Sequence, residues 1–112
     1  MTKIIRIAED FSPYPAGRFK SDGPATGERF REEFLAPSLR EGSVKLILDN
    51  VAGLPSSFLE EAIGGLIRHG FSLSDLERNL IIVAETSRMK GYPEIARKYM
   101  LEEACRSSIK SN

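Results

Sequence analysis

The fold of this chain is decided by residues 44–66, which read VKLILDNVAGLPSSFLEEAIGGL. The segment Ser43–Asp49 is a nearly continuous apolar run, which is typical of a β-strand that is covered on both faces. Residues 50–54 turn the chain, and Pro55–Gly70 then carries apolar residues at helical spacing. The stretch therefore predicts a buried strand, a tight turn and a helix.

The predicted helix has a broad apolar stripe, and a stripe of this width must face a sheet. Its members are Phe58, Leu59, Ala62, Ile63, Leu66 and Ile67. Gly64 and Gly65 interrupt the helix, and each costs about 1 kcal/mol relative to alanine. We expect the two glycines to allow the close approach of a neighbouring strand or of a partner.

Strand and helix patterns alternate along the rest of the chain. Strands are predicted at Lys3–Ala8 and Leu80–Ala84, with a possible short one at Arg18–Lys20. Helices are predicted at Thr26–Leu35 and 93–108, and a short turn or helix at 72–78, where Ser74 and Glu77 have capping-box spacing. Helical crossovers return successive strands in the same direction. We therefore predict an α/β fold in one domain, residues 1–112, with a mixed, partly parallel sheet of about four strands flanked by about three to four helices.

Length and charge narrow the classes of partner. The chain has 112 residues, of which 16 are basic and 16 are acidic. A domain without net charge has no long-range field to gather nucleic acid or an anionic membrane, so we expect neither partner. The apolar runs are shorter than the roughly 18–20 residues of a membrane-spanning helix, and the N-terminal run is too short for a signal peptide. We expect a cytoplasmic protein.

Histidine and cysteine each occur once, as His69 and Cys105. Single residues of these types form no metal-ligand cluster and no internal disulfide, so we expect no metal site and no cofactor. His69 is predicted at a helix C-terminus about 20 Å from Ser56, too far for a catalytic serine–histidine pair. Cys105 falls on the apolar side of the last helix, where we expect it to pack. We expect no catalytic residues and no enzymatic activity.

Two neighbouring hydroxyls lie in the turn that opens the second predicted helix. Ser57 and Glu60 have the spacing of a capping box, in which the hydroxyl accepts from a backbone N–H and the carboxylate reaches back. The same geometry suits a modification site, because a phosphate on Ser56 or Ser57 would lie at the positive end of a helix. The pattern therefore predicts either a structural cap or an exposed phosphorylation site.

A second candidate site is the glycine-rich loop Gly17–Glu28. Its glycines and its basic residues Arg18 and Lys20 resemble a phosphate cradle, although the spacing of a P-loop is absent. Thr26 is also placed to cap the helix that follows. The loop predicts either a small-ligand or nucleotide site or an ordinary connection.

Residues in both halves of the chain resemble the STAS-like domain family of unknown function. The resemblance covers about residues 3–84 and is carried by Ile4–Ala8, Phe11, Gly17–Arg18, Thr26–Arg31, Leu35, Pro37 and Val44–Leu66. That family is similar to the anti-sigma factor antagonists, the STAS proteins. In those proteins a strand leads to an Asp-Ser-Ser/Thr-Gly-Leu turn, and the first serine is phosphorylated by a partner with a histidine-kinase-type ATPase fold.

Aligning the strands places Ser56 at the phosphorylated serine of the antagonists. Ser57 then matches the next hydroxyl and Leu59 the leucine, whereas Pro55 and Phe58 replace the acidic residue and the glycine. The resemblance implies an interaction module that docks such an ATPase or another signalling partner. The implied partner-binding residues are Pro55, Ser56, Ser57, Phe58, Glu60 and Glu61, with Ser56 and Ser57 as phosphorylation candidates.

Two alternatives stay open beside the interaction module. One is a small-ligand or nucleotide-binding domain that uses the Gly17–Glu28 loop. The other is a structural subunit of a homo-oligomer, with Phe58 and the glycine pair Gly64 and Gly65 at an interface.

Overall fold

The computed structural model describes residues 2–110 and contains one three-stranded sheet. Strands β1 (Thr2–Arg6), β2 (Ser43–Ile47) and β3 (Leu80–Val83) lie in the order β1-β2-β3, and both pairs are parallel. The α/β prediction is confirmed. The prediction of about four strands in a mixed sheet is wrong, because the described residues form three strands that all run the same way.

The short strand predicted at Arg18–Lys20 is absent because this segment bonds to its own side chains. The carboxylate of Asp22 accepts the backbone N–H groups of Arg18 and Phe19, and residues Lys20–Asp22 form a single turn of 3₁₀ helix (η2). Backbone donors that are satisfied locally are not free for a strand ladder. The polar residues Ser21 and Asp22 therefore outweigh the weak strand signal before them.

Four helical segments connect or follow the strands, apart from one turn of π-helix after β1. Besides η2, the helical elements within residues 2–110 are η1 (Ile7–Phe11), then α1 (Gly27–Phe30), η3 (Arg31–Leu35) and α2 (Ala36–Glu41) in one run, α3 (Ser56–Leu59), η4 (Glu60–Gly64) and α4 (Gly65–Arg68) in a second run, α5 (Leu73–Asn79) and α6 (Tyr92–Lys110). Thr26 caps α1 as expected. Ser72, and not Ser74, caps α5 by accepting from the Asp75 N–H.

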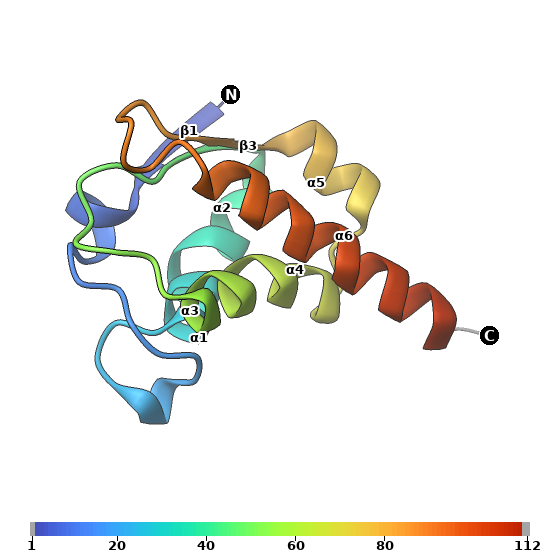
Figure 1. Cartoon of the computed structure of the whole chain (residues 1–112). Coiled ribbons are helices and arrows are strands. Elements are labelled where there is room, and N and C mark those ends of the chain that lie inside the picture. The colour runs from blue at the N-terminus through green and yellow to red at the C-terminus, as the bar shows by residue number, and fades with distance from the viewer. Residues whose placement is uncertain (1, 111–112) are drawn as a thin grey trace.

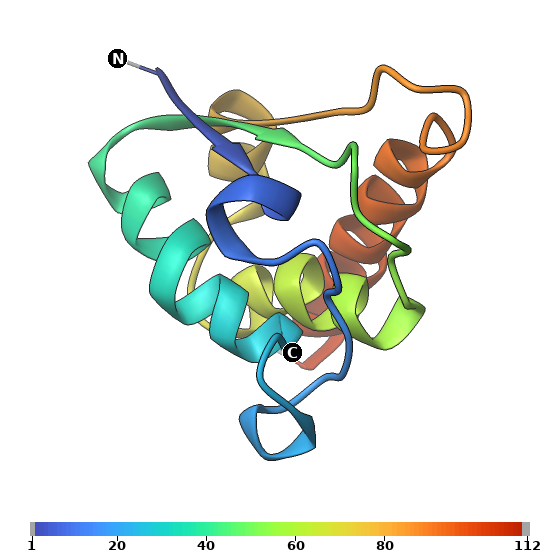
Figure 2. The same cartoon turned by 90° about the vertical axis from the view of Figure 1, so that its left-hand side faces the viewer.

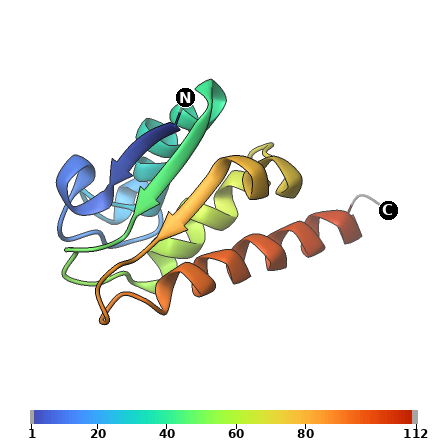
Figure 3. The same cartoon turned by 90° about the horizontal axis from the view of Figure 1, so that it is seen from above.

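The two helical runs α1–α2 and α3–α4 and the helix α6 lie on one side of the sheet. In Figure 1 the sheet is seen almost edge-on above the helices, and Figure 3 shows the strands in front with the helices behind them. Each crossover steps from one strand to the next in the same direction, and right-handed crossovers of this kind place their helices on one common face. The prediction that Ser43–Asp49 is covered on both faces is therefore wrong.

The core lies between this one face of the sheet and the helices. Phe30 and Phe58 are fully buried, and their rings are 6.0 Å apart between centroids. The ring of Phe11 lies 5.1 Å from that of Phe30 and 5.4 Å from that of Phe34. Aromatic contacts thus join the segment after β1 to the first and second helical runs.

The last helix does not bury the side that carries Cys105. Ala96, Met100 and Glu103 are buried, whereas Leu101 and Cys105 are exposed. The prediction that Cys105 packs in the core is wrong, because the helix turns the carboxylate of Glu103 inward toward Arg68. None of the helices described in residues 2–110 is long and apolar enough to cross a membrane.

Replacing Phe30 by alanine should destabilise the fold by about 3–5 kcal/mol, because it removes a fully buried ring from the aromatic cluster. Urea unfolding followed by circular dichroism measures this change. Phe19, which is half exposed, is the matched control, and Phe19→Ala should change the free energy of unfolding by less than about 1 kcal/mol. Equal effects at the two positions would contradict the packing described here.

Candidate functional site

The candidate site is the connection between β2 and α3, at the carboxyl end of the parallel sheet. Figure 2 shows this segment leaving the end of β2 and descending to the start of α3. Val51 and Leu54 are buried and anchor it, whereas Pro55 and Ser56 are exposed. Ligands and partners of open α/β sheets commonly bind at this end of the strands.

Asp49, two residues after the end of β2, ties the connection to the loop that follows β3. Its carboxylate accepts the backbone N–H groups of Glu85 (2.8 Å) and Thr86 (2.9 Å) and the Thr86 hydroxyl (2.7 Å). Burial on its own would raise the pKa of Asp49, but these hydrogen bonds outweigh it and hold the pKa below its usual value. The carboxylate therefore stays charged and fixes the base of the turn.

Two further contacts brace the middle of the connection. The N–H of Ala52 donates to the carbonyl of Pro13 at 2.7 Å, and the Arg88 guanidinium donates to the carbonyls of Val51 and Ala52. Asn50 has a φ of 71°, a left-handed conformation that asparagine tolerates better than most residues. The backbone that presents Pro55 and Ser56 is consequently held by the loop after β3, by Pro13 and by Arg88.

The capping box predicted from Ser57 and Glu60 is not formed. The N-cap of α3 is Pro55, whose side chain offers no acceptor, so both serines lie inside the first helical turn. A capping box needs the hydroxyl at the N-cap itself. Glu60 instead forms ion pairs with Arg18 and Arg68. Neither the Ser56 nor the Ser57 side chain has a hydrogen-bond partner within residues 2–110.

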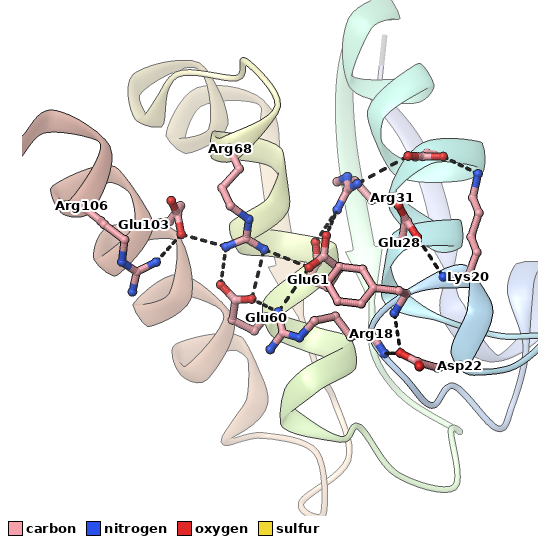
Figure 4. Close-up of polar contacts among 12 residues, drawn as sticks. Arg18, Lys20, Asp22, Glu28, Arg31, Glu60, Glu61, Arg68, Glu103 and Arg106 are labelled. Carbon is pink, nitrogen blue, oxygen red and sulfur yellow. Dashed lines mark hydrogen bonds and ion pairs between the residues drawn. The ribbon is translucent and has the colours of Figure 1, made fainter. Parts of the chain in front are cut away.

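Below the turn lies a buried ion pair between Arg31 of η3 and Glu61 of η4. Arg31 Nη1 is 2.6 Å from Glu61 Oε2 and 2.9 Å from the Glu61 carbonyl oxygen, and both side chains are at least 95% buried. The other carboxylate oxygen of Glu61 accepts from Arg18 at 3.2 Å and from Arg68 at 3.1 Å. Figure 4 shows these groups converging between the helical runs.

The network continues from Glu60 to the last helix. Arg68 Nη1 donates to Glu60 Oε2 and to Glu103 Oε1, both at 2.8 Å, and Glu103 also pairs with Arg106. Burial would raise the pKa of Glu60, but hydrogen bonds from Arg68 and Arg18 hold it below its usual value. The hydrogen bonds that Arg68 donates to Glu60 are the main reason that the pKa of Arg68 is raised. These ion pairs connect the Gly17–Glu28 loop, the two helical runs and α6. The network lies beneath the turn between β2 and α3.

The glycine pair makes room for this network and not for a strand or a partner. A Cβ at position 65 would collide with the Arg31 guanidinium, and one at position 64 would lie 2.6 Å from a Glu60 carboxylate oxygen. Both glycines are buried within the chain. The expectation of close approach is right, but what approaches is a pair of charged side chains from the chain itself.

The structure separates the predicted partner-binding residues into two groups. Pro55 and Ser56 are exposed and Ser57 is half-buried, so their surfaces are available. Phe58 and Glu61 are buried, and the charge of Glu60 is already paired. Phe58 and the two glycines likewise offer no surface to a homo-oligomer.

The Gly17–Glu28 loop uses its own carboxylates where a phosphate would bind. Asp22 accepts two backbone N–H groups, and Glu28 accepts the N–H of Lys20 at 2.8 Å. The Arg18 guanidinium pairs with Glu60 and Glu61, and Lys20 pairs with Glu32. The donors that motivated a nucleotide site are thus engaged within the chain.

A family profile described as a STAS-like domain of unknown function (DUF4325) matches residues 26–88. The chain belongs to this family. The match spans η3, β2, the turn and β3, which are the parts that hold the candidate site. No curated protein and no solved structure matches the chain.

The STAS-like fold uses residues that the sequence patterns did not single out. Arg31 and Arg68 look like ordinary surface charges in an amphipathic helix, and Asp49 looks like the end of a strand. The adjacent glycines at 64 and 65 were the available signal for buried charge, because a helix keeps such costly residues where a large group must fit. Glu103 gave no signal at all, since it follows another glutamate, Glu102, and looks like an ordinary surface charge.

Gly65→Ala should destabilise the domain by about 1–3 kcal/mol even though alanine favours helix, because the new methyl group would displace the buried Arg31 guanidinium. Gly64→Ala should cost less, since the Glu60 side chain that it meets is partly exposed and can move. Thermal unfolding of both variants measures the difference. Gly91→Ala is the control, because nothing lies within 4 Å of a Cβ there; equal losses at 64 and 65 would refute the packing argument.

Asp49→Asn should destabilise the domain at pH 7 by about 1–3 kcal/mol, because it removes the charged acceptor of partly buried hydrogen bonds. The folded pKa of Asp49 is lowered, so its stabilisation is present above the unfolded pKa of about 3.9 and is lost as the pH falls through the folded value. Urea unfolding from pH 7 to pH 3 should show the two proteins converging. A constant difference across this range would contradict the assignment.

Proposed function

We propose that this STAS-like domain is a non-enzymatic interaction module that docks a signalling partner, foremost a histidine-kinase-type ATPase, through the turn Pro55–Ser57. One observation carries the proposal. The turn exposes Pro55 and Ser56 on a backbone braced by Asp49, Pro13 and Arg88, while its two hydroxyls take no part in holding the fold together. The likeness of the family to the anti-sigma factor antagonists supplies the class of partner.

Phosphorylation of Ser56 would control this docking. The first N–H groups of α3 have no side-chain acceptor, and the positive end of a helix stabilises a phosphate. The modification would leave the fold intact while adding a charge of about −1.5 to −2 to the exposed turn. The added charge would weaken docking through repulsion and through the cost of removing its water.

The buried members of the predicted set support the docking turn from behind. Phe58 fixes the first turn of α3 in the aromatic core, and Glu61 anchors the next turn to Arg31. A surface that does not have to order itself on binding loses less conformational entropy. Direct contacts with the partner would come from Pro55, Ser56 and Ser57.

The test compares the wild type with Ser56→Ala and Ser56→Glu. Calorimetric titration with a purified histidine-kinase-type ATPase from the host should give similar affinities for the wild type and Ser56→Ala, and an affinity at least about tenfold lower for Ser56→Glu. Incubation with the same ATPase and ATP, followed by intact mass measurement and site mapping, should place phosphate on Ser56.

The matched control is Ser74→Glu, which adds the same charge to an exposed serine of α5. That variant should bind like the wild type. Equal affinity of all four proteins would refute the phosphorylation switch, and failure of the wild type to bind any ATPase of this class would refute the docking proposal.

A further inference from the structure

The face of the sheet that points away from the helices carries an apolar surface. Six of its in-register positions are Ile4 and Arg6 of β1, Lys45 and Ile47 of β2, and Ile81 and Val83 of β3. Ile4 is 46% exposed and Ile81 is 49% exposed. We call these six residues the open face; Figure 3 looks down on it.

The open face is unusual for the kind of sheet that bears it. Sheets made only of parallel strands occur almost entirely with both faces covered. Here the strand order β1-β2-β3 directs every crossover to the same side, so the chain supplies no second layer within residues 2–110. Large apolar side chains in a contiguous exposed group mark an interaction surface.

The charged residues of the open face indicate the chemistry of the partner that would cover it. Lys45 lies on the central strand, with Ile4 and Ile81 as its neighbours in register. Arg6, the other charged member, already pairs with Glu9 at 3.9 Å, and none of the six positions is acidic. Lys45 has no ion-pair partner among the described residues, so its ammonium group is free to pair with a carboxylate from outside.

The dimensions of the open face fit one helix. Three strands about 4.8 Å apart span about 10 Å between the outer two, and five residues of strand extend about 17 Å. One α-helix has a diameter of about 10 Å, and about three turns of it cover that length. A stable protein dimer buries about 800 Å² of surface on each partner, which is more than a face of this size offers. A two-fold contact between copies would also bring the positive charges of two open faces together, so a second copy of the chain is disfavoured.

We infer that the open face docks an amphipathic helix of a protein partner whose apolar stripe carries an acidic residue opposite Lys45. Ile4 and Ile81 would contact the apolar side chains of that helix on either side of the ion pair. The open face and the helices that follow the Ser56 turn lie on opposite sides of the sheet. The inference does not depend on the proposed function of that turn.

The experiment uses two synthetic helical peptides with the same apolar stripe, one with glutamate and one with lysine flanking it. Fluorescence anisotropy with the full chain should show the acidic peptide binding at least about tenfold tighter than the basic one. Lys45→Glu should reverse this order, which a merely misfolded variant could not do. Amide chemical shifts should move at β1, β2 and β3.

Three controls make the result specific. Ile81→Ser should weaken the acidic peptide at least about tenfold, whereas Leu101→Ser, at an equally exposed apolar position of α6, should not change its affinity. Ser56→Glu should leave peptide binding unchanged, which separates this surface from the turn. Failure to bind either peptide, or equal binding by Lys45→Glu, would overturn the inference. A dimer in light scattering that Ile81→Ser dissociates would overturn it in favour of a second copy.

Discussion

The buried ion pair between Arg31 and Glu61 is the constraint on which the arrangement of the helices depends. Two charges removed from water are stable only if their remaining hydrogen-bonding groups are also satisfied. Arg18 and Arg68 meet this need at Glu61, and the carbonyl of Glu61 meets it at Arg31. Gly65 follows from the same requirement, because a side chain there would occupy the place of the guanidinium.

The elements of the fold were largely predictable because they depend on local patterns. The apolar run of β2 and the stripe of Phe58, Leu59 and Ile63 specify strand and helix directly. The covering of the sheet was not predictable from β2, because Lys45 and Ile47 alternate with buried residues in a run that reads as apolar. Whether a second face is covered depends on the order of the strands, which no single strand encodes.

The position of the candidate site in the chain was predictable, but the hydrogen bonds and ion pairs of its residues were not. The position of Ser56 after a buried strand identified the turn. The roles of Ser57 and Glu60 were not predictable, because the capping pattern was shifted by two residues and a distant arginine, Arg18, competes for the carboxylate. Contacts between residues about forty positions apart leave no trace in local spacing.

The ionic contacts differ in how deeply they are buried, and this difference has a consequence for ionic strength. Salt screens exposed charges strongly and buried pairs much less. Lys20 and Glu32 are about half exposed, whereas Arg31 and Glu61 are almost fully buried. Rising salt therefore weakens the contact between Lys20 and Glu32 much more than the pair between Arg31 and Glu61, so the tip of the loop loosens while Arg18 and the helical runs stay joined.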